Sequence, residues 1–182
     1  MKLTCITAAV AAAVRFSASS AQAGELSLDG EWKLELADDR SVTCPIRVPG
    51  GVHSALLKAG LMDDACWGRN EEKMQWVGRS DWNISRSFDV PADFAAKKEI
   101  VLRLEDCDAF ATILVNGQKV GETTDRFQRY EFDVKPFLKA GANTVEGRFR
   151  SPELEGDRRR AAKGRAFPRR YATRRTTSCP SR

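Results

Sequence analysis

An all-β fold, in which two antiparallel sheets pack as a sandwich beside one short helix, is predicted by three features of this 182-residue sequence. Short segments alternate apolar and polar residues, as Trp32–Leu36 does, and this alternation is typical of half-buried strands. The dipeptide Asn116-Gly117 stands between two such segments, and Asn-Gly is the preferred two-residue hairpin turn. Turn-forming residues separate the alternating segments at short intervals. We therefore expect a sandwich domain over residues 24–151, enough chain to bury one face of each sheet.

The expected elements follow one another closely. After the strand at 32–36, a short extended piece at 45–48 ends at Pro49-Gly50-Gly51. Apolar residues at helical spacing then predict a helix over 52–61, with Gly60 at its end. Further strands are expected at 83–90, 99–104, 109–115, 129–134 and 144–149. The predicted core comprises Trp32, Trp82, Phe88, Leu102, Ile113, Val115 and Phe132.

The first 23 residues have the features of a secretory signal peptide. Lys2 supplies a positive start, residues 3–14 form an apolar run, and Ala21-Gln22-Ala23 is a small-x-small cleavage site. The apolar run is too short for a membrane span, and no second apolar stretch is long enough to cross a bilayer. We expect a secreted or periplasmic protein without a membrane span.

Basic residues are concentrated at the carboxyl end. Ten of the 30 Lys and Arg residues follow Asp157, where no acidic residue occurs, so residues 1–157 carry a net charge of about −5. The Arg-rich segment 152–182 is expected to be disordered, because it holds too little apolar surface to offset its ordering entropy. We further hypothesise a change of reading frame near residues 162–164. Apart from Phe167 and Tyr171, the segment lacks interleaved aromatics, so no specific nucleic-acid partner is expected.

Four cysteines remain after residue 23, at Cys44, Cys66, Cys107 and Cys179. Their spacing fits neither a zinc site nor a Cys-x-x-Cys redox motif. Isolated thiols are one interpretation, and a disulfide is the other because an exported protein permits pairing. If a pair forms, Cys44 with Cys66 is the first candidate.

Several short motifs occur in order between residues 28 and 150. They include Leu28-Asp29-Gly30-Glu31-Trp32, Val48-Pro49-Gly50-Gly51-Val52-His53, Gly68-Arg69-Asn70-Glu71, Trp76-Val77-Gly78-Arg79-Ser80-Asp81-Trp82 and Val115-Asn116-Gly117. In this order they resemble the amino-terminal, sugar-binding-type (galactose-binding-like) domain of a β-mannosidase of glycoside hydrolase family 2, here truncated. The motifs at residues 68–71 and 76–82 favour β-mannosidase over β-galactosidase or β-glucuronidase.

The resemblance implies a jelly-roll sandwich and, in the full-length relative, hydrolysis of terminal β-D-mannose residues with retention. In that family both catalytic glutamates lie on a later (β/α)₈ barrel, which this resemblance does not reach. We therefore expect no catalytic residue, metal or cofactor in this chain, and no activity of the chain alone. The expected partners are β-mannosides, in the full-length relative, and the catalytic barrel. The alternatives are a free-standing lectin-like module and a structural domain whose exposed face meets a barrel.

Candidate substrate-binding residues gather in one aromatic and charged segment. They are Trp67, Arg69, Asn70, Glu71 and Trp76. Arg and Asn side chains can hydrogen-bond vicinal hydroxyls, and a Trp ring can stack on the apolar face of a pyranose. The alternative is structural: the tryptophans pack in a core or between domains, and residues 69–71 brace the loop.

Overall fold

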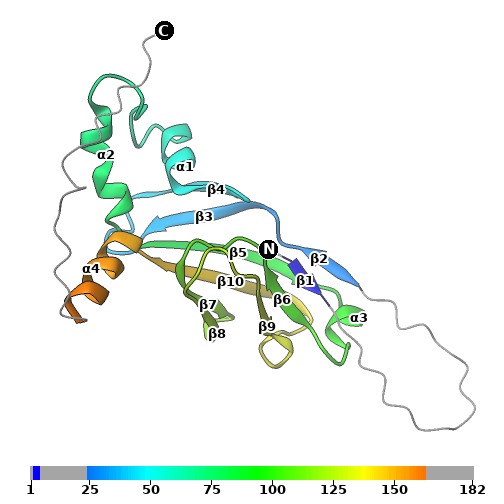
Figure 1. The fold of residues 1–182 in the computed structure, drawn as a ribbon. Coiled ribbons are helices and arrows are strands. Elements are labelled where there is room, and N and C mark those ends of the chain that lie inside the picture. Colours follow the sequence, from blue (N-terminus) through cyan, green and yellow to red (C-terminus); the bar gives the residue numbers. More distant parts are fainter. Residues whose placement is uncertain (1, 5–23, 163–182) are drawn as a thin grey trace, which may run out of the picture.

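Two antiparallel sheets form the body of the protein, for which the computed structural model describes residues 2–4 and 24–162 (Figure 1). The four-stranded sheet has the order β2 (Glu25–Ser27), β1 (Lys2–Thr4), β6 (Val101–Leu104) and β9 (Tyr130–Asp133). The six-stranded sheet has the order β4 (Thr43–Val48), β3 (Gly30–Leu36), β5 (Trp82–Val90), β10 (Gly141–Arg150), β7 (Phe110–Val115) and β8 (Gln118–Thr123). The predicted all-β sandwich is confirmed.

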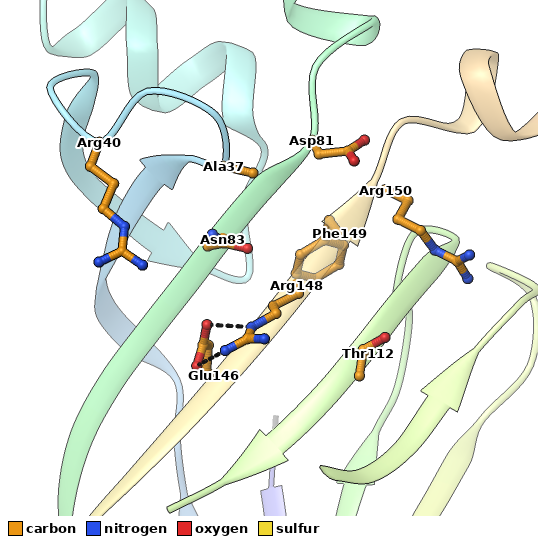
Figure 2. Close-up of a pocket in the computed structure, with 9 residues that line it drawn as sticks. All are labelled: Ala37, Arg40, Asp81, Asn83, Thr112, Glu146, Arg148, Phe149 and Arg150. Atoms are coloured by element: carbon orange, nitrogen blue, oxygen red, sulfur yellow. Dashed lines mark hydrogen bonds and ion pairs between the residues drawn. The ribbon is translucent and has the colours of Figure 1, made fainter. Parts of the chain in front are cut away.

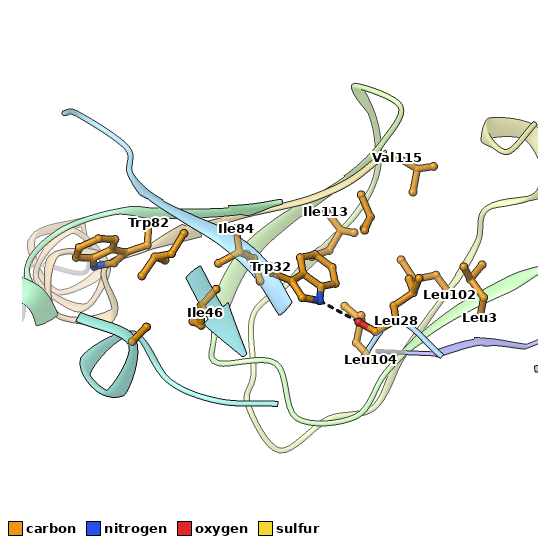
Figure 3. Packing of buried hydrophobic residues seen from close by; sticks show 14 of the residues in the cluster. Leu3, Leu28, Trp32, Ile46, Trp82, Ile84, Leu102, Leu104, Ile113 and Val115 are labelled. Atoms are coloured by element: carbon orange, nitrogen blue, oxygen red, sulfur yellow. Dashed lines mark hydrogen bonds between the residues drawn. The ribbon is translucent and has the colours of Figure 1, made fainter. Parts of the chain in front are cut away.

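The core lies between the two sheets and follows from the alternation along each strand (Figure 3). Leu34 pairs in register with Cys44 and with Ile84, so three apolar side chains point inward in one row. Of the predicted core residues, Trp32, Trp82, Leu102, Ile113 and Val115 are buried, and Phe88 and Phe132 pack against the core while partly exposed. Each buried indole also has a partner: Trp32 Nε1 donates to the carbonyl of Leu28 at 2.9 Å.

The predicted hairpin joins β7 to β8. Asn116 and Gly117 have φ angles of 50° and 78°, the left-handed conformation that the tight turn requires. The Asn116 amide donates to the carbonyl of Phe137 and to Oδ1 of Asn143, both at 2.8 Å. The turn is thereby fastened to η1 (Lys135–Phe137) and to the start of β10.

The prediction of one short helix was wrong. The predicted helix is present as α1 (Val52–Lys58), but α2 (Asn70–Gly78), α3 (Ala92–Ala95) and α4 (Pro152–Ala162) are helices as well. The segment that forms α2 is rich in Glu, Lys, Met and Gln, which are good helix formers, and carries two carboxylates in its first turn. This composition explains why a helix forms here, in a segment for which the sequence analysis predicted no regular element.

The expected disorder from residue 152 onward was wrong for residues 152–162, which form α4. Ser151 caps this helix: its hydroxyl accepts from the amide of Leu154 at 3.2 Å and donates to the carbonyl of Gly78 at 2.7 Å. Arg159 lies over the Phe110 ring, 4.3 Å from its centroid. These contacts with the sandwich stabilise a helix whose own sequence is strongly polar. Residues 163–182, including most of the region of the hypothesised frame change, lie outside the described residues.

Glu155 joins α4 to the sheet. Its carboxylate accepts a hydrogen bond from Arg159 at 3.0 Å and lies 3.6 Å from a guanidinium nitrogen of Arg150 in β10. The hydrogen bond from Arg159, reinforced by the surrounding guanidinium charges, lowers the pKa of Glu155. The carboxylate therefore stays ionised at neutral pH, and its charge holds the helix against the sheet.

The cysteine hypothesis is corrected in one respect. Cys44 is a free thiol on β4, so it forms no disulfide with Cys66. Its side chain is buried, and burial raises its pKa because the thiolate loses hydration. The interpretation of Cys44 as a buried isolated thiol is the one that the structure supports. Cys179 lies outside the described residues.

Candidate functional site

All five predicted site residues lie in a segment that we call the α1–α2 arm, residues 52–78, which stands beside the β3–β4 edge of the larger sheet (Figure 1). Trp67 precedes α2, Arg69 is the N-cap residue just before the helix, and Asn70 and Glu71 occupy its first turn. Trp76 follows further along the same helix. The first four residues are therefore neighbours, while Trp76 lies at a different position on the arm.

Local hydrogen bonds give the loop before α2 its shape. The Asp64 carboxylate accepts from the amide of Cys66 at 2.9 Å, and the Asp64 carbonyl accepts from the amide of Trp67 at 3.1 Å. Asn70 completes the loop, since its side-chain amide donates to the same Asp64 carbonyl at 3.1 Å. Asn70 therefore braces the loop, as the structural alternative expected, and offers a ligand only its remaining hydrogen-bonding capacity.

Arg69 is accessible but engaged with its own helix. Its Nε and Nη2 donate to one carboxylate oxygen of Glu72, at 3.2 and 2.7 Å. The hydrogen bond to Glu72 raises the pKa of Arg69, and the negative charge of that carboxylate raises it further. Glu71 is exposed, and its carbonyl accepts from the side chain of Gln75 at 3.1 Å. The arm thus presents a fixed cation and carboxylates within one helical turn, which suits hydrogen bonding to hydroxyl groups.

The two tryptophans of the arm differ in their surroundings. Trp67 is 78% exposed, the most accessible of the large apolar side chains on the arm. Trp76 is 37% exposed and its ring lies 5.9 Å from that of Trp82, tilted by 42°. Trp82 is itself buried and donates to the carbonyl of Val77 at 3.0 Å. Trp76 therefore serves packing at least in part, whereas Trp67 offers an open aromatic face.

A second exposed aromatic was missed by the sequence analysis. Phe127 is 92% exposed in the loop between β8 and β9, yet the loop around it is well braced. The amide of Phe127 donates to the carboxylate of Asp125 at 2.9 Å, and the Tyr130 hydroxyl accepts from the amide of Asp125 at 2.8 Å. Arg126 pairs with Asp106 at 3.4 Å across to the β6–β7 loop. An aromatic residue outside any alternating segment was the only sequence signal for this position.

Asp106 is the other unusual residue of this loop pair, because it is a non-glycine residue with a φ of 115°. It lies in the turn that follows β6, and its side chain is exposed. Among residues 2–4 and 24–162, no three His, Cys, Asp or Glu side chains are grouped so as to hold a metal ion.

The outer face of the larger sheet carries a shallow hollow of about 410 Å³ (Figure 2). It is lined by Ala37, Arg40, Asp81, Asn83, Thr112, Glu146, Arg148, Phe149 and Arg150, and by none of the predicted site residues. Several of its charged groups are engaged within the protein. Arg148 donates to both oxygens of Glu146, at 2.8 and 3.3 Å, and Asp81 accepts from the amide of Ser151 at 2.7 Å. These residues serve to brace the sheet and α4.

No helix within the described part of the chain is both long and apolar enough to cross a membrane.

The chain is similar to proteins of known activity. A family model described as "Glycosyl hydrolase 2 galactose-binding domain-like" matches residues 32–180, a span that continues past the predicted domain end at 151. The chain is 32% identical over 134 residues to the beta-mannosidase of Bos taurus, and 34% identical over 125 residues to that of Rattus norvegicus. These alignments cover 74% and 69% of this chain, but only 15% and 14% of the relatives.

Solved structures support the same relationship. The beta-D-mannosidase of Dictyoglomus thermophilum superposes with a TM-score of 0.73 at 38% identity, over 78% of this chain and 17% of that protein. The beta-D-glucuronidase of the same organism superposes with a TM-score of 0.52 at 20% identity, over 68% of this chain and 19% of that protein, a likeness of fold alone. The chain thus spans about 15% of the curated relatives that it matches.

Proposed function

Because this chain belongs to the galactose-binding-like domain family of glycoside hydrolase family 2, we propose that it is the amino-terminal jelly-roll domain of an exported β-mannosidase-like enzyme. The likeness in both sequence and fold to the Dictyoglomus β-D-mannosidase carries this proposal. The full-length enzyme hydrolyses terminal β-D-mannose residues, and its two catalytic carboxylates belong to a part of the polypeptide beyond this domain. The 182 residues alone are inactive.

The α1–α2 arm is the part of the domain that meets the catalytic portion of the enzyme. Four of the five exposed large apolar side chains of the described residues lie on it, namely Leu57, Leu61, Trp67 and Trp76. Such a concentration of apolar surface on one element marks a contact with another protein part. The occupant is the catalytic portion of the same enzyme, because relatives of this chain are about six to seven times longer than the matched region.

Within that contact, Trp67 and Arg69 lie at the rim of the substrate pocket. An exposed indole can stack on a sugar ring, and a fixed guanidinium can donate to its hydroxyls. Glu71 adds an acceptor in the same helical turn, while Asn70 and Trp76 hold the rim in place.

An activity measurement separates this proposal from a self-sufficient enzyme. The purified 182-residue chain is incubated with p-nitrophenyl β-D-mannopyranoside, and nitrophenol release is followed at 405 nm. We expect a rate equal to that of the buffer. A rate that rises in proportion to protein concentration would show that the chain holds its own catalytic groups and would refute the proposal.

A binding measurement separates the proposal from a free-standing lectin-like module. Mannose and mannobiose are titrated into the chain while the tryptophan fluorescence is recorded. A rim that lacks the opposite wall of its pocket should show no saturation at millimolar sugar. Saturation that disappears in Trp67→Ala and persists in Trp76→Ala would favour the lectin-like alternative.

The apolar surface of the arm has its own test. A hydrophobic dye should bind the isolated chain, and the double variant Leu57→Ser, Trp67→Ser should lower the dye signal by about half. Lys58→Ser lies on the same helix and replaces a polar side chain, so it should leave the signal unchanged. A double variant that binds as much dye as the wild type would exclude the arm as the docking surface.

A further inference from the structure

Strand β1 is the shortest interior strand of the sandwich. Its residues 2–4 pair antiparallel with β2 on one side and with β6 on the other (Figure 1). β2 and β6 are therefore parallel to each other and stand two strand spacings apart, about 9.5 Å. Among the strands of residues 2–4 and 24–162, β2 has β1 as its only neighbour. Three residues at the extreme amino terminus thus join β2 to the rest of the sheet.

The middle residue of β1 belongs to the core. Leu3 is 1% exposed and lies in register with Leu26 on β2 and Leu102 on β6, and Leu102 is in register with Phe132 on β9. Residues in register across a sheet share a face, so this row of four apolar side chains points into the sandwich. Figure 3 shows Leu3 beside Leu102, on the inner side of the smaller sheet.

The predicted signal peptide includes this strand. Cleavage after Ala23 would remove residues 2–4 and leave β2, which begins at Glu25, in the mature protein. β2 would then lack a neighbour, one edge of β6 would lose its partner, and their backbone N–H and C=O groups would be unpaired over apolar surface. The span matched by the family model begins at residue 32, so β1 lies outside the sequence that this chain shares with the family model.

We infer that removal of residues 1–23 opens a one-strand slot between β2 and β6, which accepts an extended segment with an apolar residue at the position of Leu3. The segment runs antiparallel to both neighbours and binds through its backbone, as in strand addition to a sheet. Its source is the remainder of the enzyme-length polypeptide, and this identification of the source rests on the proposed function. Until residues 1–23 are removed, β1 occupies the slot.

The test uses the full chain with the slot vacated. Leu3→Asp places a carboxylate in the apolar row and should expel β1 from the sheet. The probe is a fluorescein-labelled peptide of residues 1–8 with Cys5→Ser, and its binding is followed by fluorescence anisotropy. We expect saturable binding to the Leu3→Asp chain. The same peptide carrying Leu3→Asp should bind about thirtyfold more weakly or worse, because it cannot fill the row.

The wild-type chain provides the competition control. Its own β1 occupies the slot at an effective concentration of about millimolar, so the probe should bind it at least about tenfold more weakly than it binds Leu3→Asp. Leu57→Asp changes an exposed leucine of α1, far from the slot in the fold, and should bind the probe as weakly as the wild-type chain does. Equal binding of the probe to the wild-type and Leu3→Asp chains would show that it attaches elsewhere, and this outcome would overturn the inference.

Amide hydrogen exchange gives a second measurement that needs no added peptide. In the wild-type chain the amides of residues 25–27 and 101–104 that point toward β1 should be protected. Leu3→Asp should lose this protection, and saturating probe should restore it. Should Leu3→Asp aggregate, Leu3→Ala weakens the same contact and should show partial loss. Unchanged protection of both strands in these variants would refute the slot, while leaving the activity and dye measurements of the proposed function unaffected.

Discussion

The stability of the β9–β10 connection should depend on one buried amide, that of Asn143. This side chain is 1% exposed and uses all of its hydrogen-bonding groups. Its Oδ1 accepts from the amide of Lys139 at 3.0 Å and from Nδ2 of Asn116 at 2.8 Å. Its Nδ2 donates to the carbonyls of Lys139 and Gly141, both at 2.7 Å. The substitution Asn143→Asp keeps the shape of the side chain and removes only the two donors.

The cost follows from these four contacts. Two lost hydrogen bonds cost about 1 kcal/mol each, and an oxygen that replaces the donor nitrogen between two buried carbonyls adds about 1–3 kcal/mol. We therefore expect the free energy of unfolding to fall by about 3–5 kcal/mol at pH 7. Burial and the facing carbonyls raise the folded-state pKa of the introduced carboxyl above the unfolded value. The protonated form is therefore favoured on folding, and the loss should be smallest at low pH and grow as the pH rises through that pKa.

Urea unfolding followed by tryptophan fluorescence at pH 4 and pH 7 measures both effects. Asn83→Asp is the matched control, because Asn83 is half-buried on the outer face of β5 and should change stability by only about 0.5 kcal/mol. An Asn143→Asp protein within about 1 kcal/mol of the wild type at pH 7, or one whose loss does not exceed its loss at pH 4, would refute this account of the amide.

Four further substitutions test packing, helix propensity and capping by urea unfolding. Gly121→Ala should destabilise the protein by about 1–3 kcal/mol because the new methyl group would overlap the Phe132 ring. Gly156→Ala in α4 meets no atom within 4 Å and should stabilise the protein by about 0.5–1 kcal/mol. Stability changes of the same sign in the two variants would contradict this reasoning. Leu34→Ala empties a fully buried position between the sheets and should cost about 2–5 kcal/mol, so a loss below 1 kcal/mol would show that the core collapses around it. Ser151→Ala removes the cap of α4 and should cost about 1–2 kcal/mol with faster amide exchange confined to that helix, and unchanged exchange there would contradict the capping role.

Local patterns were sufficient to predict most strands. The alternation of Trp32–Leu36 and the Asn116-Gly117 turn each depend on neighbouring residues only, and both appear in the structure as expected. The helix α4 could not be predicted in this way. Its stability comes from Ser151 and Arg159, which contact Gly78 and Phe110 far away in the sequence.

The same distinction between local and long-range information applies to the candidate site. Trp67 and Arg69 are close in the chain, so their proximity on the arm needed no tertiary information. The assignment of Trp76 to packing required the position of Trp82, and the exposure of Phe127 required the loop that Tyr130 braces. Substrate contact by Trp67, Arg69 and Glu71 stays a prediction.

By itself the sequence determined the all-β class, the hairpin turn, the residues that face the core and the family motifs, because period-two alternation and turn chemistry act over a few neighbouring residues. Only the tertiary structure decided which strands become neighbours, and it placed residues 2–4 between β2 and β6. The physical reason is that strand pairing depends on matching apolar rows, such as Leu26, Leu3 and Leu102, whose members are distant in the chain and meet only when the sandwich closes.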